Sequence, residues 1–225
     1  MNQAELKQRC AEAAVDYVVE DEYLGVGTGT TVGFFITALA KSGKRVKGCV
    51  SSSEASTRQL LAMGFPVADL NEVDKLPVYI DGADEIDDGF HMIKGGGGAL
   101  YREKVVATLA KEVIWIVDES KLVDQIGAFH LPVEIAQYGA KQAVAKMEEY
   151  GWHPVLRVKD GKPYVTDNGN YIADLHLGAG FDIGDVKTKL GTIIGVLEHG
   201  LFLNLCKRVI VGTKDGVRVI ENQSK

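Results

Sequence analysis

The chain has 225 residues, enough for one large domain or two small ones, and its 46% hydrophobic and 25% charged residues are typical of a globular protein with a substantial core. Its net charge of −6 disfavours a nucleic-acid-binding protein, which would need a basic face. The three cysteines include no C-x-x-C pair, so neither a zinc site nor a dithiol is expected. Scattered thiols and the lack of a signal peptide or a long apolar run predict a cytoplasmic location.

Strands and helices alternate over the first 125 residues. The helices are predicted over residues 3–20, 54–63 and 99–111 and in the segment from Phe34 to Ala40, where apolar residues recur at helical spacing. The strands are predicted at Tyr23–Val26, Val46–Val50, Pro77–Asp81, His91–Lys94 and Val113–Val117. This alternation predicts an α/β fold: a Rossmann-like, mostly parallel sheet with helices on both faces.

The pattern changes near residue 130. Strands are predicted at Leu131–Gln137, Val155–Lys159, Tyr164–Thr166, Tyr171–His176 and Ile193–Leu197, with helices over residues 140–150 and 182–190. The order β-α-β-β-α-β, with one extra strand segment, predicts a smaller ferredoxin-like α+β domain. We therefore expect a Rossmann-like catalytic domain of residues 1–129 and 205–225, and a small domain of residues 130–204 that serves in oligomerisation or as a lid.

A loop rich in glycine and threonine follows the first predicted strand and reads Gly25-Val-Gly27-Thr28-Gly29-Thr30-Thr31-Val-Gly33. It matches neither G-x-G-x-x-G nor the P-loop pattern, which disfavours a dinucleotide or a nucleoside triphosphate. Backbone N–H groups at a helix start, joined by threonine hydroxyls, suit a small phosphomonoester. An ordinary strand-to-helix turn is the alternative.

Two carboxylates follow the strand that ends at Asp81, in the turn Asp81-Gly82-Ala83-Asp84. Paired acids can exchange protons with substrate hydroxyls if their environments differ. The alternative is that both aspartates only form the turn, a common role for this residue. The next acids, Glu85, Asp87 and Asp88, are expected to form a solvated acidic rim.

Lys94 ends the next short strand and precedes four glycines, Gly95–Gly98, after which the predicted helix carries Glu103. A carboxylate kept partly dry can move a proton between adjacent carbons. Taken singly, however, Lys94 reads equally well as a surface lysine, and Glu103 reads as a helix-surface glutamate. The five histidines are scattered singly, so no metal site is expected.

Taken together, these motifs resemble the ribose-5-phosphate isomerases of the A type. The resemblance runs in order along the whole chain and rests on Val26-Gly-Thr-Gly-Thr-Thr31, Ser52-Ser-Glu54, Asp81-Gly-Ala-Asp84-Glu85, Lys94-Gly-Gly-Gly-Gly-Ala-Leu100, Arg102-Glu-Lys104, Asp118-Glu-Ser-Lys121 and Glu198-His-Gly-Leu-Phe202. It implies interconversion of D-ribose 5-phosphate and D-ribulose 5-phosphate in the non-oxidative pentose phosphate pathway, without metal or other cofactor, by a homodimer or larger oligomer.

The resemblance also implies roles for individual residues. Glu103 would be the base that moves a proton between C2 and C1 through an enediolate, and Lys94 would stabilise the oxyanion. Asp81 and Asp84 would bind hydroxyls, in the substrate-binding segment Asp81, Gly82, Ala83 and Asp84, and assist ring opening. The remaining substrate contacts would come from Thr28, Gly29, Thr30 and Thr31 to the phosphate, from Gly95, Gly96 and Gly97 to the sugar, and from Lys121 to a hydroxyl or the phosphate, with Lys7 as a weaker candidate for the phosphate.

Two other functions remain open at this point. One is a non-catalytic sugar-phosphate sensor, although only about twenty residues precede the first predicted strand, too few for a helix-turn-helix. The other is acyl transfer through a covalent intermediate at Glu103.

Overall fold

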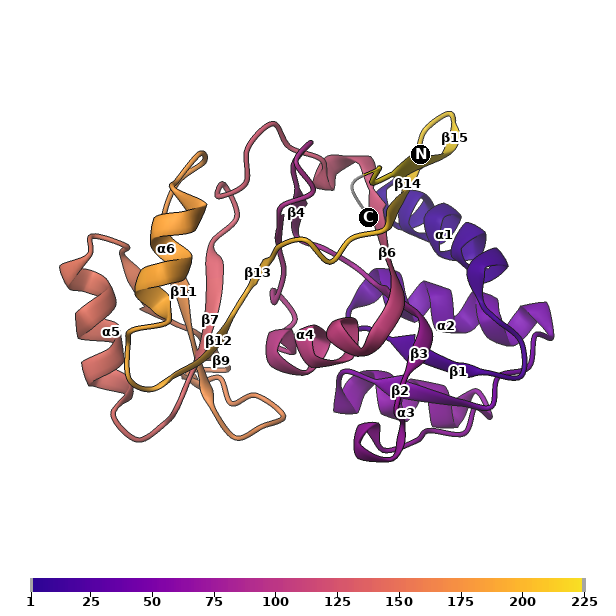
Figure 1. Cartoon of the computed structure of the whole chain (residues 1–225), viewed down its shortest axis with the longest axis horizontal. Helices are drawn as coiled ribbons and strands as arrows, with labels where there is room; N and C mark the ends of the chain where they lie inside the picture. Colours follow the sequence, from indigo (N-terminus) through magenta and orange to yellow (C-terminus); the bar gives the residue numbers. More distant parts are fainter. Residues whose placement is uncertain (1, 224–225) are drawn as a thin grey trace. The chain divides into compact units, whose positions relative to one another are not determined.

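The computed structural model describes residues 2–223, which pack as two compact units (Figure 1). The first unit consists of the chain up to Ala83, Arg102–Leu122 and the chain from Asn204 onward; the second consists of Asp84–Tyr101 and Val123–Leu203. Each unit has its own sheet and its own apolar core.

The first unit is built on a six-stranded sheet with the order β15-β14-β6-β3-β1-β2. All pairs are parallel except that of β14 with β15, which confirms the predicted mostly parallel sheet. The order reverses between β1 and β3, and in doubly wound sheets ligands bind at the carboxyl ends of the strands at this switch point. The strands are β1 (Tyr23–Val26), β2 (Gly48–Ser51), β3 (Leu76–Asp81), β6 (Ala110–Asp118), β14 (Arg208–Thr213) and β15 (Gly216–Glu221).

Helices α1 and α2 cover one face of this sheet, and Figure 1 shows α4 on the other. Alternate strand residues such as Ile80, Ile116 and Ile210 are fully buried in the core beneath α1 and α2. The helical elements are α1 (Gln3–Ala14), η1 (Val15–Tyr17), α2 (Thr30–Ser42), α3 (Glu54–Ala62), η2 (Leu70–Glu72), α4 (Leu100–Leu109) and η3 (Glu119–Lys121). No helix within residues 2–223 has the length and apolarity to cross a membrane.

The predicted helix over residues 3–20 is too long, because α1 ends at Ala14 and tightens into the 3-10 turn η1. Its start follows from a capping box: the Asn2 side chain accepts a hydrogen bond from the Glu5 backbone N–H, and the Glu5 carboxylate accepts one from the Asn2 N–H.

The second unit contains the ferredoxin-like domain that the sequence predicts. Its four-stranded antiparallel sheet has the order β12-β7-β11-β8, and α5 and α6 follow β7 and β11 in the chain. The elements are β7 (Leu131–Ile135), α5 (Ala140–Glu149), β8 (Pro154–Leu156), β11 (Tyr171–Leu175), α6 (Ile183–Leu190) and β12 (Val196–His199).

The extra strand segment differs from its prediction. The expected strand Val155–Lys159 is broken at Arg157 into β8 and β9 (Val158–Lys159), and β9 pairs with β10 (Lys162–Pro163) in a small hairpin. The predicted strand Tyr164–Thr166 is therefore wrong. The chain instead leaves the hairpin at Pro163 and forms a loop.

A third sheet explains where the units divide. It consists of β4 (Glu85–Ile86), β5 (Met92–Ile93) and β13 (Leu201–Phe202), all antiparallel. The pairing of β5 with β13 ties residues 84–101 to the second unit, whereas the predicted boundaries place these residues in the catalytic domain. The roles predicted for the two domains, catalysis for residues 1–129 and 205–225 and oligomerisation or a lid for residues 130–204, stay predictions.

Candidate functional site at the carboxyl ends of β1 and β3

The buried carboxylate of Asp81 is the centre of the polar groups at the switch point of the first unit. Asp81 is fully buried at the end of β3. Its Oδ1 accepts hydrogen bonds from the N–H groups of Thr28 at 3.0 Å and Gly82 at 2.7 Å, and its Oδ2 accepts one from the Tyr79 hydroxyl at 2.6 Å. The parallel pairing of β1 with β3 brings Thr28 and Asp81 together across 53 residues of sequence.

Tyr79 is a member of this site that the sequence analysis missed. Burial raises the pKa of the Tyr79 hydroxyl well above 10, and the charges of Asp81 and Glu103 raise it further, so the hydroxyl stays a neutral donor. The two-residue spacing from Asp81 was the available signal, because side chains i and i+2 of a strand lie on the same face.

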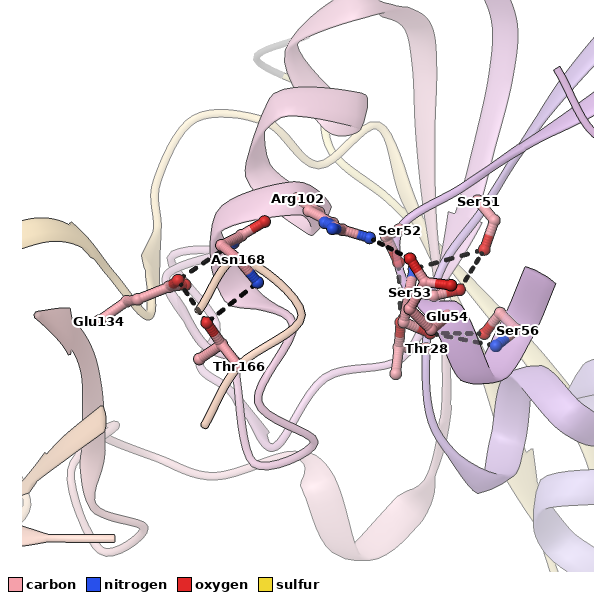
Figure 2. Close-up of polar contacts among 10 residues, drawn as sticks. All are labelled: Thr28, Ser51, Ser52, Ser53, Glu54, Ser56, Arg102, Glu134, Thr166 and Asn168. Carbon is pink, nitrogen blue, oxygen red and sulfur yellow. Dashed lines mark hydrogen bonds and ion pairs between the residues drawn. The ribbon is translucent and has the colours of Figure 1, made fainter. Parts of the chain in front are cut away.

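Gly27 provides the space that Asp81 occupies. A Cβ at Gly27 would overlap the side-chain Cβ and Cγ of Asp81, so no larger residue fits without moving the carboxylate. The carbonyl of Gly27 accepts a hydrogen bond at 2.7 Å from the Ser56 hydroxyl on α3, and Thr28 Oγ1 lies 2.8 Å from Ser52 Oγ (Figure 2). Serine and threonine hydroxyls thus fix the loop on both sides.

The remainder of the predicted phosphate loop begins α2. Gly29 is the N-cap with φ of 104°, and no side chain caps the helix. Thr30 is exposed, and its Oγ1 accepts a hydrogen bond at 3.2 Å from Lys7 Nζ, which comes from α1. Next to these groups, α1 and α2 line a cavity of about 440 Å³ that includes Gln3, Ala4, Lys7, Thr30, Gly33, Phe34 and Thr37.

Glu103 and Lys121 also belong to the first unit. Glu103 lies on the first turn of α4, and only 3% of its surface is exposed, so the helix-surface alternative for this glutamate is wrong. Its neighbour Arg102 is instead the outward residue, with an ion pair of 3.2 Å to Glu54 (Figure 2). Lys121 is half-buried in η3, directly after the carboxyl end of β6.

The second unit holds Asp84, Lys94 and the glycines. Asp84 Oδ2 accepts a hydrogen bond at 2.8 Å from the Gly96 N–H, so the second aspartate lies on the Gly95–Gly98 loop. Lys94 is only 3% exposed, with its Nζ 5.3 Å from the centre of the Phe202 ring, and this burial rules out a surface lysine. The structure therefore separates Asp81 and Asp84 into two networks, one for each glycine loop.

The expectation that Glu85 forms part of a solvated rim is wrong. Glu85 is 5% exposed, and its carboxylate accepts hydrogen bonds from the N–H groups of Gly127 at 2.6 Å and Phe129 at 2.7 Å. Neighbouring acids in the sequence gave no signal for this inward position. Of the three acids, Asp87 is partly buried beside His91, and only Asp88 is exposed.

A second buried carboxylate of this unit, Glu134 on β7, holds the loop after β10. Its Oε1 accepts hydrogen bonds from the Thr166 hydroxyl at 2.8 Å and from the Asn168 amide at 3.0 Å (Figure 2). The Asn170 amide donates to the same oxygen at 3.0 Å. The result is a fixed loop from Tyr164 to Asn170 above β7. Among the described residues, no three His, Cys, Asp or Glu side chains are grouped so as to hold a metal ion.

A doubly wound sheet with a buried carboxylate, a hydroxyl-rich loop and an uncapped helix at its switch point defines an α/β protein built to bind a small ligand there. Comparison with known proteins is more specific. The family described as ribose 5-phosphate isomerase A (phosphoriboisomerase A) matches residues 48–216. The ribose-5-phosphate isomerase A of Streptococcus mutans is 46% identical over 221 residues, covering 96% of this chain and 98% of that protein.

Solved structures agree with the sequence comparison. The crystal structure of ribose 5 phosphate isomerase A from Neisseria gonorrhoeae superimposes with a TM-score of 0.92 at 44% identity, covering 98% of this chain and 97% of that one. A D-ribose-5-phosphate isomerase in complex with phospho-erythronic acid gives a TM-score of 0.93 at 35% identity, covering 99% and 100%. The chain therefore belongs to the ribose 5-phosphate isomerase A family, and it is an isomerase.

Proposed function

We propose that this chain interconverts D-ribose 5-phosphate and D-ribulose 5-phosphate through an enediolate. The observation that carries the proposal is the burial of Glu103: in a chain of this family, a carboxylate only 3% exposed on the first turn of α4 is suited to act as a general base. In the open-chain aldose, Glu103 removes the proton from C2 and returns it to C1, while the O2 proton moves to O1. The carbonyl is thereby transferred from C1 to C2 with no change in net oxidation state.

Other residues have roles that follow from their chemistry. Lys94 supplies positive charge to the developing oxyanion, a contribution that is large when the charge is preorganised and partly dry. Asp81 and Asp84 accept hydrogen bonds from sugar hydroxyls and assist ring opening. The phosphate is assigned to the segment Thr28–Thr31 at the start of α2, where backbone N–H groups and hydroxyls attract an anion, and the hydroxyl contact of Lys7 with Thr30 supports a place for this lysine nearby.

The remaining assignments complete the proposal. Gly82, Ala83 and the glycines Gly95, Gly96 and Gly97 contact the sugar through their backbone, and Lys121 binds a hydroxyl or the phosphate. We further propose that the enzyme works as a homodimer in the cytoplasm, where its three cysteines, all free and buried, would remain reduced. A phospho-erythronic acid complex of a relative supports a small sugar phosphate as the ligand.

The test is the conversion of ribose 5-phosphate by the purified full chain in the presence of EDTA, followed in D2O by NMR. We expect turnover, with deuterium incorporated from solvent, because a base-mediated shuttle exposes the transferred proton to exchange. Turnover would also establish that no metal is needed, which stays a prediction until then. Absence of turnover, with ribose 5-phosphate still raising the melting temperature, would favour the sensor.

The role of Glu103 is tested separately by Glu103→Gln, which keeps the shape and removes the base. We expect kcat to fall by about 10²–10⁴-fold with little change in KM, the pattern of a group that acts in the transition state. Glu12→Gln on α1 is the control and should leave both constants unchanged, since Glu12 is exposed. A Glu103→Gln enzyme with normal kcat would exclude Glu103 as the base.

A further inference from the structure

Arg157 of the ferredoxin-like domain contacts the glycine loop of the proposed active site. It lies at the break between β8 and β9, and only 14% of its side chain is exposed. Its Nη1 donates hydrogen bonds to the carbonyl oxygens of Gly95 at 3.0 Å and Gly96 at 3.1 Å. These are bonds across about sixty residues of sequence, between two segments of the same compact unit.

Asp174 on β11 holds this guanidinium in place. The Arg157 Nε donates to Asp174 Oδ2 at 2.9 Å, and Nη2 donates to Asp174 Oδ1 at 2.6 Å, so the pair is bidentate. A two-point pair of planar groups fixes orientation as well as distance. It leaves Nη1 directed at the glycine carbonyls, which is the arrangement expected of a group that aligns a loop.

The consequence for the loop follows from peptide geometry. No cis peptide occurs among the described residues, so the carbonyl of each peptide and the N–H of the next residue point in opposite directions. The Arg157 bonds draw the carbonyls of Gly95 and Gly96 to one side, which turns the N–H groups of Gly96 and Gly97 to the other. The Gly96 N–H accordingly meets Asp84 Oδ2 at 2.8 Å.

A cation bound to a carbonyl also strengthens the N–H donor of the same peptide, because hydrogen bonds in a chain polarise one another. Tyr164 extends the arrangement to a third carbonyl, with its hydroxyl 3.5 Å from Gly97 O and against Gly98, where an added Cβ would overlap the Tyr164 hydroxyl. Side chains of the ferredoxin-like domain therefore contact the carbonyls of Gly95, Gly96 and Gly97.

We propose that Arg157 and Asp174 are positioning residues for the isomerisation: together they set the direction and the donor strength of the Gly96 N–H, which holds the Asp84 carboxylate, and of the Gly97 N–H, which we assign to the reacting end of the sugar. The inference rests on the proposed function. It assigns the ferredoxin-like domain a part in catalysis, beyond the oligomerisation or lid role expected from the sequence.

The experiment compares Arg157→Lys and Asp174→Asn with the wild-type enzyme. Arg157→Lys keeps the charge, but its three donors lie on one nitrogen and cannot make the bidentate pair with Asp174 together with bonds to both glycine carbonyls. We expect kcat/KM to fall about tenfold or more, mainly through kcat, since a misdirected donor loses most where the oxyanion forms. Inhibition by phospho-erythronic acid, whose carboxylate resembles the planar enediolate, should weaken in proportion.

The matched control is Arg208→Lys. Arg208, on β14 of the first unit, is 16% exposed and pairs with Glu221 at 3.0 Å and Glu112 at 3.4 Å, whereas Gly95–Gly98 lie in the second unit. The Arg208→Lys variant should lower the melting temperature about as much as Arg157→Lys does, while leaving kcat/KM unchanged.

The results for these variants decide between a positioning role and a purely structural one. The double variant Arg157→Lys/Asp174→Asn should lose no more activity than Arg157→Lys, because Asp174 acts through Arg157. A folded Arg157→Lys enzyme with wild-type kcat/KM and normal inhibition overturns the inference, as does a fall equal to that of Arg208→Lys. If Arg157→Lys does not fold, Asp174→Asn carries the same test. An inactive wild-type chain would instead refute the proposed function.

Discussion

The two glycine loops of this protein, Gly25–Gly33 and Gly95–Gly98, each hold an aspartate through a backbone N–H, but their carbonyl groups have different partners. In each loop a backbone N–H binds one aspartate of the turn after β3: Thr28 donates to Asp81 in the first unit and Gly96 donates to Asp84 in the second. The carbonyls on the reverse side differ in their partners. Gly27 O accepts from the neutral hydroxyl of Ser56, whereas Gly95 O and Gly96 O accept from the guanidinium of Arg157.

This difference separates two tasks. A loop held by neutral hydroxyls and by its own strand pairing provides a fixed cradle whose N–H groups are of ordinary strength, which is sufficient for a phosphate that keeps its charge throughout the reaction. A loop polarised by a cation provides stronger donors, which help most where charge develops. On the proposed function, the first loop binds and the second assists the chemistry.

Of the changes in the two loops, Gly27→Ala should have the larger effect. The added methyl group would overlap Cβ and Cγ of Asp81, a carboxylate held by three hydrogen bonds, so the side chain cannot move without breaking them. We expect a loss of about 1–3 kcal/mol in stability and at least a hundredfold in kcat/KM. Urea denaturation and steady-state kinetics measure the two. In Gly184→Ala on α6, the methyl group meets only Asp182 Oδ1 at 3.4 Å, and neither loss should occur.

Gly96→Ala should have a smaller effect, which makes it the direct comparison. Here the added Cβ meets the far oxygens of Asp84 at 2.8 and 3.1 Å and the ring edge of Phe129 at 3.1 Å, and side-chain ends can adjust. We expect about a tenfold loss of kcat/KM with little change in the urea midpoint. Equal effects of Gly27→Ala and Gly96→Ala would mean that the two aspartates are held with equal rigidity, contrary to their contacts.

How much of this could be predicted from the sequence depends on whether the contacts are local. The end of β3 at Asp81 and the loop after β1 follow from apolar runs bounded by glycine, and parallel pairing then brings Thr28 to Asp81. The ferredoxin-like order was likewise correct, because β7, β11 and the helices α5 and α6 are long enough to show a period.

The features that the sequence did not predict show no periodic pattern of apolar residues. Strands β4, β5 and β13 have two residues each, too few for a period of two, so the sequence analysis did not place residues 84–101 with the second unit. Arg157 and Asp174 are 17 residues apart, and their contact depends on the register of β11 with β8, in which Asp174 lies opposite Val155. A single arginine between Leu156 and Val158 gives no hint of this register.

Tyr79→Phe tests how much a neutral hydroxyl contributes to holding Asp81 beside the first loop. The change removes the Tyr79 hydroxyl that donates to Asp81 and leaves the backbone N–H donors of Thr28 and Gly82. The cost of losing a hydrogen bond to a charged group is about 1.5–3 kcal/mol, so we expect a tenfold or greater fall in kcat/KM. The control is Tyr171→Phe, a half-buried tyrosine on β11, which should retain activity. An unchanged kcat/KM in Tyr79→Phe would show that Thr28 and Gly82 suffice to hold the carboxylate.

The smallest effect concerns the response of the two units to alkali. Burial raises the pKa of Cys10, Cys49 and Cys206 from 9.0 to about 12, and all three lie in the first unit. Because the folded thiols bind their protons more tightly than the unfolded ones, stability is fully present below pH 9 and falls as the pH rises toward 12.

At pH 10 this amounts to about 1.4 kcal/mol for each thiol. Urea midpoints between pH 7 and 10.5 should therefore fall above pH 9, and the fall should be shallower by about a third in Cys49→Ala, whatever the loss of that variant at pH 7. Ionisation of Tyr79, whose pKa is also raised by burial, adds to the fall of the urea midpoint with pH. The fall in Tyr79→Phe therefore measures the share that the tyrosine contributes. Hydrogen exchange should place the alkaline opening in the first unit, where these four groups lie; opening confined to the second unit would contradict this origin of the pH dependence.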